Sequence, residues 1–457
     1  MNKRVLVLAV VLLSTVTFPL TITGASVALP DIREQLGAGI SATQWVVNGY
    51  NAAFAGFLVV TGSLADILGR RRVFAAGVAL FCAANAVSAL AGGIVMLNVV
   101  RALGGIGAAA AVAGGGAVLA EAFPGASRAR AFGLLGTTLG AGLAFGPTVG
   151  GLLVDALGWR AVFGLPAVVS ALVLMCAPLL PRSTPTPGRR LDVPGAAVFT
   201  GALLLLIFAL VEVPELGFGS WVIIASLVLV VVLTAVFPAV ERRSADPMFD
   251  LAVLANRWFL ALAVAAGSIV FVLIPLLVYL PSYLISVAGL SPGAAGTWLL
   301  MLTGPAVLLP TAGAALARRL PPVVMVAGSV ALTAAGAFWL TTIGPASTPW
   351  TLLGPLVLTG AGMGLSTGLL DGLAIGSVRP DQAGVAAGMF NASRLATETV
   401  GIAVVGAVLA ALTHDALAGP DYTTALRWVC CGLGVFATLA TAGVAVLHRR
   451  GSAVPVA

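Results

Sequence analysis

Gly62-Ser-Leu-Ala-Asp66-Ile-Leu-Gly69-Arg70-Arg71-Arg72 is the stretch that decides the fold. Apolar runs of roughly 20 residues, long enough to cross a bilayer, flank it on both sides. Its glycines let the backbone turn and approach a neighbouring helix closely. Asp66 is placed to bond free helix-end donors or to pair with arginine, and the three arginines favour the cytoplasmic side. The stretch therefore predicts a tight, charged loop between two membrane spans.

The composition is that of a polytopic membrane protein. Of the 457 residues, 60% are hydrophobic and 9% are charged, and the mean hydropathy is +1.10. Long apolar runs separated by short polar loops indicate α-helical spans, because a bilayer interior offers no water to exposed backbone groups. The net charge of +7 is carried by arginines in loops rather than along one face. We therefore expect the protein to lie in a lipid bilayer and not to bind nucleic acid.

The apolar runs predict an all-α protein with fourteen spans. The first apolar run continues to about Pro30, which is too long for a cleaved signal peptide. The predicted spans lie near residues 6–29, 44–65, 73–93, 96–119, 131–154, 160–180, 194–213, 220–240, 258–284, 292–316, 322–342, 350–377, 384–411 and 424–447.

The basic residues predict the orientation of these spans. With the N-terminus inside, 18 of the 23 basic residues fall in cytoplasmic segments, three in outside loops and two within helices. The 18 are Lys3, Arg4, Arg70, Arg71, Arg72, Arg128, Arg130, Arg182, Arg189, Arg190, Arg242, Arg243, Arg257, Arg318, Arg319, Arg379, Arg449 and Arg450. This bias predicts that both termini are cytoplasmic.

Two longer cytoplasmic segments divide the chain into six, two and six spans. Residues 181–193 are proline-rich and basic, and residues 241–257 predict an amphipathic surface helix. We expect an N-terminal six-helix bundle (1–180), a linker carrying two extra spans (181–257) and a C-terminal six-helix bundle (258–457). Residues 313–320, Gly-Ala-Ala-Leu-Ala-Arg-Arg-Leu, resemble a worn copy of 62–72 at the equivalent place in the second half, as a duplicated unit would have.

Two predicted spans carry unusual residues. Span 4 contains Arg101 followed by three glycines, and an arginine in a span is costly unless it is paired or faces water. It either lines a polar cavity or extends to the outer surface. In span 5, small residues four apart predict a face for tight helix crossing, bent at Pro147. The residues of this face include Gly142, Gly146, Pro147 and Gly150.

Together these motifs resemble the fourteen-span drug:proton antiporter family of the major facilitator superfamily, the EmrB/QacA-like multidrug exporters. In that family the loop like Gly62–Arg72 is a latch between the two halves, although a purely topogenic basic loop remains the alternative here. The arginine like Arg101 takes part in proton movement. The motif Gly146-Pro-Thr-Val-Gly-Gly151 is associated with export rather than uptake. The resemblance covers nearly the whole chain and implies two rocking bundles.

One departure from the family concerns the first span. The family usually has an acid at the position of Thr21, and that acid is tied to proton or cation handling. Its loss puts the usual coupling site in doubt and favours neutral or anionic cargo.

The acids that remain inside spans are the other candidates for proton coupling. Glu398 lies four residues after Arg394, on the same helix face, and the two form either a switchable or a static pair. Asp371 either carries protons or caps a helix break near Gly372 and Gly376. The proton-coupling candidates are therefore Glu398, Arg394, Asp371 and Arg101.

Polar and aromatic residues at cavity depth are candidates for substrate contact, although each is also explained as packing or as a belt anchor at the interface. They are Thr21, Thr23, Trp45, Asn48, Tyr50, Tyr279, Tyr283, Trp298 and Asn391.

These observations predict a proton-coupled exporter of amphipathic organic compounds in a bacterial cytoplasmic membrane, acting as a monomer without cofactor or metal. The alternative is a dedicated exporter of one endogenous metabolite, an antibiotic or lipid-like product, with altered or no proton coupling. An enzyme is not expected, because no catalytic motif is present. The four cysteines lie in apolar runs without C-x-x-C spacing, and the two histidines form no metal-ligand pattern.

Overall fold

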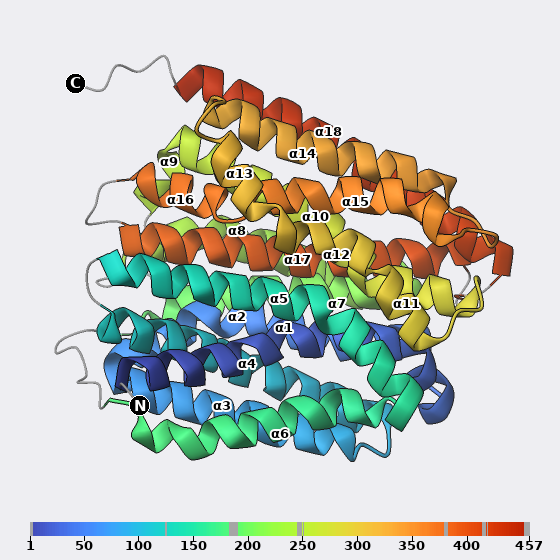
Figure 1. Cartoon of the computed structure of the whole chain (residues 1–457), viewed down its shortest axis with the longest axis horizontal. Helices are drawn as coiled ribbons and strands as arrows, with labels where there is room; N and C mark the ends of the chain where they lie inside the picture. Colours follow the sequence, from blue (N-terminus) through green and yellow to red (C-terminus); the bar gives the residue numbers. More distant parts are fainter. Residues whose placement is uncertain are drawn as a thin grey trace. The chain divides into compact units, whose positions relative to one another are not determined.

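The computed structural model is built from α-helices and describes residues 3–123, 126–181, 191–244, 249, 251–378, 383–413, 417 and 419–451 (Figure 1). The helices up to the middle of the chain are α1 (Lys3–Leu36), α2 (Ile40–Leu68), α3 (Arg70–Ala89), α4 (Ile94–Ala122), α5 (Ala126–Leu157), α6 (Arg160–Cys176), η1 (Ala177–Leu179), α7 (Val193–Leu216) and α8 (Trp221–Glu241). The others are α9 (Leu251–Ala255), α10 (Arg257–Ser286), α11 (Pro292–Trp298), α12 (Leu300–Leu308), α13 (Pro310–Leu316), α14 (Pro322–Trp339), η2 (Leu340–Thr342), α15 (Pro349–Ser366), α16 (Leu369–Gly376), α17 (Ala383–Thr413) and α18 (Gly419–Gly451).

The predicted all-α architecture is confirmed, and the structure has 13 to 14 candidate spans where fourteen were predicted. Within the described residues, 13 helices or helix pairs are long and apolar enough to cross a membrane, and a bent pair supplies the fourteenth span. That pair runs from Pro292 to Leu316 with a bend of 42°. The agreement follows from length and composition, since roughly 20 apolar residues suffice to span a bilayer.

Spans 10 and 12 each consist of more than one helix. Span 10 consists of α11, α12 and α13, and Pro310 at the start of α13 cannot donate the backbone hydrogen bond that would continue α12. Span 12 consists of α15 and α16, which are separated by Gly368 with φ of 76°. Gly368 tolerates this left-handed conformation because it has no Cβ. The break therefore lies before Asp371, not near Gly372 and Gly376.

The contacts divide the chain into two compact units. The first comprises Met1–Met248 together with Ser291–Gly296, and the second comprises Phe249–Leu290 and Thr297–Ala457. The extra helices α7 and α8 thus belong to the first unit. Thr200 on α7 donates a hydrogen bond to the Gly56 carbonyl on α2 (2.7 Å), and Ser41 donates to the Val211 carbonyl (3.2 Å).

Glycines, which have no side chain, allow helices of the first unit to pack closely. A Cβ atom on Gly77 would meet the backbone of α4 at Ala111, and one on Gly107 would meet Phe81 of α3. A Cβ atom on Gly105 would collide with the Tyr50 carbonyl of α2. These glycines explain why α4 lies against both α2 and α3, as small residues do at membrane helix interfaces.

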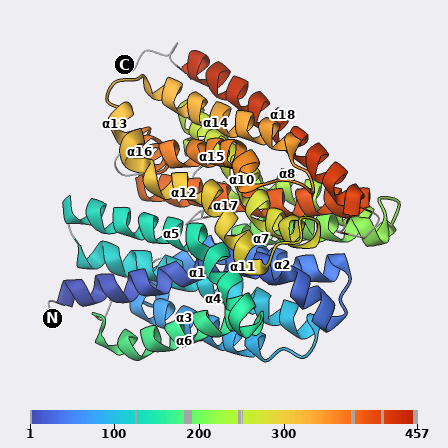
Figure 2. The same cartoon turned by 45° about the vertical axis from the view of Figure 1, so that its right-hand side comes forward.

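The second unit is built around α10, whose apolar window is 83% buried. Figures 1 and 2 both show α14 and α18 side by side, in agreement with their many contacts. Glycines at 360, 362 and 364 bring α15 against α12 and α14, because a Cβ atom there would meet Leu302, Thr333 or Pro305. These glycines therefore form a packing face.

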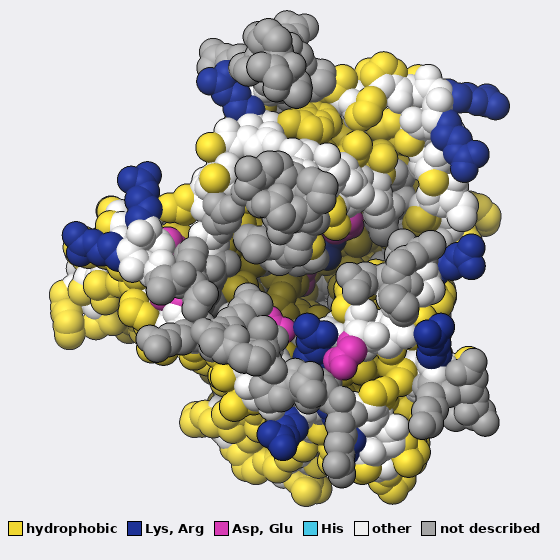
Figure 3. Space-filling model, turned by 90° about the vertical axis from the view of Figure 1, so that its left-hand side faces the viewer, with side chains coloured by type: hydrophobic (Ala, Val, Ile, Leu, Met, Phe, Trp, Pro, Cys, Tyr) yellow, Lys and Arg dark blue, Asp and Glu magenta, His cyan; other side chains and the backbone are white. Residues whose placement is uncertain are grey.

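The surface carries the pattern expected of a membrane protein. The apolar window of α8 is only 11% buried, so most of its Leu and Val side chains face outward. In the view of Figure 3, Arg side chains are spread over one end of the helices. The predicted linker residues 182–190, the stretch 245–248, and Arg379 lie outside the described residues. In the segment predicted as a surface helix, α9 covers Leu251–Ala255.

Candidate functional site

The loop around Gly69 joins α2 to α3 and holds an arginine between two acids. Gly69 has φ of 100°, which turns the chain sharply between the helices. Arg70 lies 3.6 Å from Asp66 through Nε and 3.6 Å from Glu121 of α4 through Nη1. Arg71 donates a hydrogen bond to the Leu180 carbonyl after α6 (2.9 Å). The predicted pairing of Asp66 with arginine is confirmed, whereas Gly62 has open space where a side chain would be.

Arg101 on α4 is completely enclosed by the first unit. It is 1% exposed, so it does not extend to the surface. Its Nε donates to the Val46 carbonyl (2.9 Å), and its Nη1 lies 3.4 Å from the Thr21 hydroxyl. The Tyr50 and Phe163 rings lie 4.3 and 5.3 Å from the guanidinium carbon, in cation–π contact. The Nη2 atom has no hydrogen-bond partner among the described residues.

A hydrogen bond from Thr21 extends this site to α3, and α2 buries a further polar residue, Asn48. The Thr21 hydroxyl donates to Asn85 Oδ1 on α3 (3.1 Å), and Asn85 Nδ2 donates to the Phe81 carbonyl (2.9 Å). Asn48 is fully buried, and both of its amide atoms lack a partner within the described ranges. The predicted residues Thr21, Tyr50 and Arg101 therefore meet in one place. Sequence reasoning missed Asn85 and Phe163, although an asparagine inside an apolar run was a usable signal.

The small face of α5 packs on α1, as its spacing predicted. A Cβ atom on Gly142 would meet the Val16 carbonyl, one on Gly146 the Thr23 hydroxyl, and one on Gly150 the Gly24 backbone. Pro147 lies inside the continuous helix α5. Thr23, a predicted substrate residue, here packs between α1 and α5, and its hydroxyl donates to the Pro19 and Leu143 carbonyls.

The same helix α5 also contacts the segment Ser291–Gly296. Thr148 donates to the Gly296 carbonyl (2.9 Å), and a Cβ atom on Gly151 would collide with the Pro292 carbonyl. Asp155 Oδ2 accepts hydrogen bonds from the Ser291 hydroxyl and the Gly293 amide, both at 3.0 Å. A carboxylate at the start of a helix is favourable, so Asp155 caps α11. Sequence reasoning missed this contact, because the partners are 136 and 138 residues apart.

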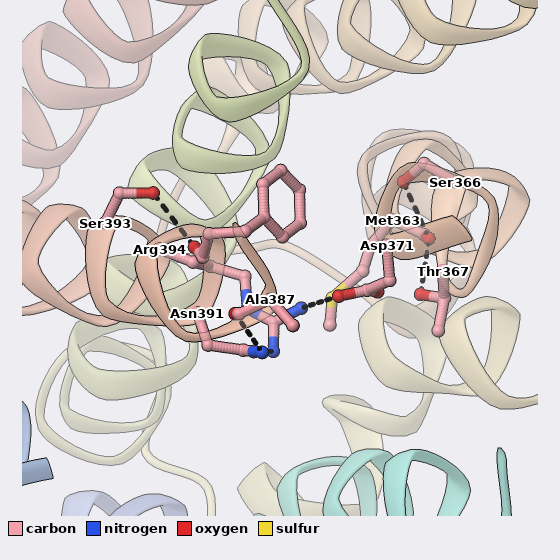
Figure 4. A network of polar contacts seen from close by, with 9 residues as sticks. Met363, Ser366, Thr367, Asp371, Ala387, Asn391, Ser393 and Arg394 are labelled. Atoms are coloured by element: carbon pink, nitrogen blue, oxygen red, sulfur yellow. Dashed lines mark hydrogen bonds and ion pairs between the residues drawn. The ribbon is translucent and has the colours of Figure 1, made fainter. Parts of the chain in front are cut away.

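Arg394 on α17 is the centre of the polar network in the second unit (Figure 4). Its Nη1 lies 3.7 Å from Asp371 Oδ1, and its Nη2 donates to Asn391 Oδ1 (2.8 Å). The partner of Arg394 is thus Asp371 of α16 rather than Glu398, with which no ion pair is found in the described part of the chain. Glu398 lies one turn further along α17 and is 9% exposed.

The remaining predicted substrate residues make internal contacts. Trp45 Nε1 donates to Glu212 Oε1 of α7 (2.7 Å). Tyr279 donates to the Ile402 carbonyl (3.1 Å), and the Tyr283 hydroxyl lies 3.0 Å from that of Thr423. Trp298 is half-buried at the end of α11.

Comparison with known proteins places the chain in a family. The model of the Major Facilitator Superfamily matches residues 11–397. "Multidrug resistance protein Stp" of Mycobacterium tuberculosis (strain CDC 1551 / Oshkosh) is 33% identical over 84% of this chain and 72% of its own. The "Probable actinorhodin transporter" of Streptomyces coelicolor (strain ATCC BAA-471 / A3(2) / M145) is 35% identical over 83% of this chain and 68% of its own.

The fold is also that of a solved transporter. The crystal structure of the POT family transporter PepTSo has a TM-score of 0.70, covers 98% of both chains and shares 15% sequence identity. The sequence match and the fold agree with the motifs described above, and the chain is a multi-pass membrane protein that belongs to the major facilitator superfamily.

Proposed function

We propose that the chain is a proton-coupled exporter of amphipathic organic compounds in a bacterial inner membrane. Two relatives carry the names of a multidrug resistance protein and of a probable actinorhodin transporter, which supports transport of small organic molecules. The orientation with both termini in the cytoplasm rests on the bias of 18 basic residues to three. We expect the chain to work as a monomer that alternates access between two helix bundles.

The observation that carries the proton coupling is the group of Asp371, Arg394 and Glu398 on the apolar helices α16 and α17. Charged residues at such positions are costly and mark ion pathways by default. Arg394 holds Asp371 at 3.7 Å, while Glu398 has no ion-pair partner in the described residues. Glu398 is therefore proposed as the proton carrier, and Arg394 as the charge that changes partner when Asp371 or Glu398 is protonated.

Conformational roles are proposed for two contacts of the first unit. The loop that holds Arg70 between Asp66 and Glu121 would act as a latch, because both pairs must stretch if α2, α3 and α4 shift. The cap that Asp155 places on α11 would act in the same way, because it joins α5 to the segment that begins span 10.

A second candidate is a dedicated exporter of one endogenous metabolite. It is favoured by Thr21, which contacts Arg101 at a position where the family resemblance implies an acid. The name of the actinorhodin transporter agrees with this alternative.

Transport by everted membrane vesicles with an acidified lumen tests the proposal. Such vesicles should accumulate a dye from a panel of cationic, neutral and anionic compounds, and nigericin should abolish the accumulation. Glu398→Gln should lower the proton-driven rate at least about tenfold, the change that ~1.4 kcal/mol makes in a rate. Glu34→Gln, which alters an exposed acid on α1, is the matched control.

Three results would contradict or change the proposed function. Normal proton-driven transport by both Glu398→Gln and Asp371→Asn would remove the coupling assignment. Transport that continues in the presence of nigericin would show that the protein is a uniporter and not a proton antiporter. Transport of one compound from a broad panel would favour the dedicated exporter.

A further inference from the structure

Arg101 is a buried cation that lacks a counter-charge. Among the residues that the structure describes, no carboxylate lies within ion-pair distance of its guanidinium, and its side chain is 1% exposed. A buried charge is normally paired. The contacts that it does make, to the Val46 carbonyl and the Thr21 hydroxyl, are with neutral groups.

The free donors of Arg101 are arranged for an anion. Nε is used by Val46, and Nη1 makes only the long 3.4 Å contact to Thr21, while Nη2 has no partner. The Thr21 hydroxyl gives its proton to Asn85 and so turns a lone pair toward Arg101. Adjacent Nη1 and Nη2 donors form the planar fork that binds a carboxylate through two hydrogen bonds.

The surroundings make this fork specific for an amphipathic ligand. The rings of Tyr50 and Phe163 stack near the guanidinium and leave its edge for hydrogen bonding. The ligand would thus meet a cation beside aromatic surface, which suits a carboxylate attached to an apolar body.

We propose that Arg101, with Thr21 and Tyr50, forms a binding site for the carboxylate of an amphipathic organic anion. This inference rests on the proposed export function and names its substrate class. The guanidinium is covered in the present conformation, and the anion reaches it when the helices around it shift during alternating access.

The test uses purified full-length protein in nanodiscs and the fluorescent probe 1-pyrenebutyrate, with its methyl ester as the uncharged control. Binding is followed by energy transfer from tryptophan to pyrene, relative to empty nanodiscs. Thr21→Asp would place an internal carboxylate beside Nη1, and Thr21→Asn is its neutral, nearly isosteric control. The wild type should prefer the carboxylate to the ester, and Thr21→Asn should bind the carboxylate at least about tenfold more tightly than Thr21→Asp does, whereas the ester should not distinguish these two variants.

Thermal unfolding checks that Thr21→Asp is folded; its unfolding temperature should equal or exceed that of the wild type, because the new carboxylate neutralises Arg101. Wild-type protein that prefers the ester, or equal binding of pyrenebutyrate by Thr21→Asp and Thr21→Asn, would overturn the proposal. Stabilisation of the wild type by sodium chloride alone, without preference for the carboxylate, would assign an inorganic anion and also overturn it. Vesicles that export cationic or neutral dyes while pyrenebutyrate does not bind would refute this inference and leave the proposed export function standing.

Discussion

Arg101 in the first unit and Arg394 in the second are both arginines within spans, yet their environments are opposite. Arg101 is 1% exposed and contacts backbone, hydroxyl and aromatic groups. The Arg394 side chain is 33% exposed and pairs with Asp371 at 3.7 Å. Each unit therefore has its own polar centre, one with excess positive charge and one in which two acids accompany the arginine. Under the two proposals above, an organic anion binds in the first unit and protons bind in the second.

Replacement of each arginine by lysine should separate the two sites most strongly. Arg101→Lys should lower stability by about 3 kcal/mol, because lysine cannot keep both the Val46 hydrogen bond and the stacking on Tyr50. Arg394→Lys should lower the free energy of unfolding by less than about 1 kcal/mol, because the lysine ammonium can still pair with the partly exposed Asp371. Unfolding temperatures measured in the same detergent give the order, and equal losses would contradict the comparison.

The two glycines after Arg101 give a prediction of intermediate size. Gly105→Ala should destabilise the protein by about 2 kcal/mol, because its Cβ atom would collide with the Tyr50 carbonyl and displace the ring beside Arg101. Gly104→Ala is the control, since its Cβ atom would lie 3.4 Å from that of Ala84, an ordinary contact. The same thermal measurement applies, and a loss from Gly104→Ala as large as that from Gly105→Ala would show that the loss does not come from the collision with the Tyr50 carbonyl.

The smallest expected change in stability belongs to Asp371→Asn. The pair with Arg394 is about one-third exposed on both sides, so its loss should cost about 0–1 kcal/mol and less at high salt. Proton-driven transport should nevertheless slow, which separates function from folding at this residue. A large, salt-independent drop in the unfolding temperature would instead identify the pair as structural.

The pattern of apolar runs and charged loops predicted the membrane class and the spans, because the bilayer forces that pattern on any helical protein. The packing face on α5 was also readable, since glycine spacing follows the helix period. The helix breaks at Gly368 and before Pro310 could not be predicted from the sequence, because membrane-spanning apolar runs tolerate both glycine and proline. The partner of Arg394 was missed because helix spacing pointed to Glu398, whereas the ion pair comes from another helix. Asn85 contacts Thr21 and Phe163 contacts Arg101 from other helices; the asparagine inside an apolar run was a usable local signal, whereas no local pattern marked Phe163.

The hydrogen bond from Trp45 to Glu212 has a mechanical consequence for α7 and α8. Together with the bonds made by Ser41 and Thr200, it attaches α7 to α2 along its length. A tilt of α2 would therefore be passed to α7 and on to α8, a helix whose apolar window is only 11% buried. The extra helices α7 and α8 thus expose an apolar surface that is coupled to α2. The thickness of the surrounding bilayer should therefore influence how easily α2 tilts.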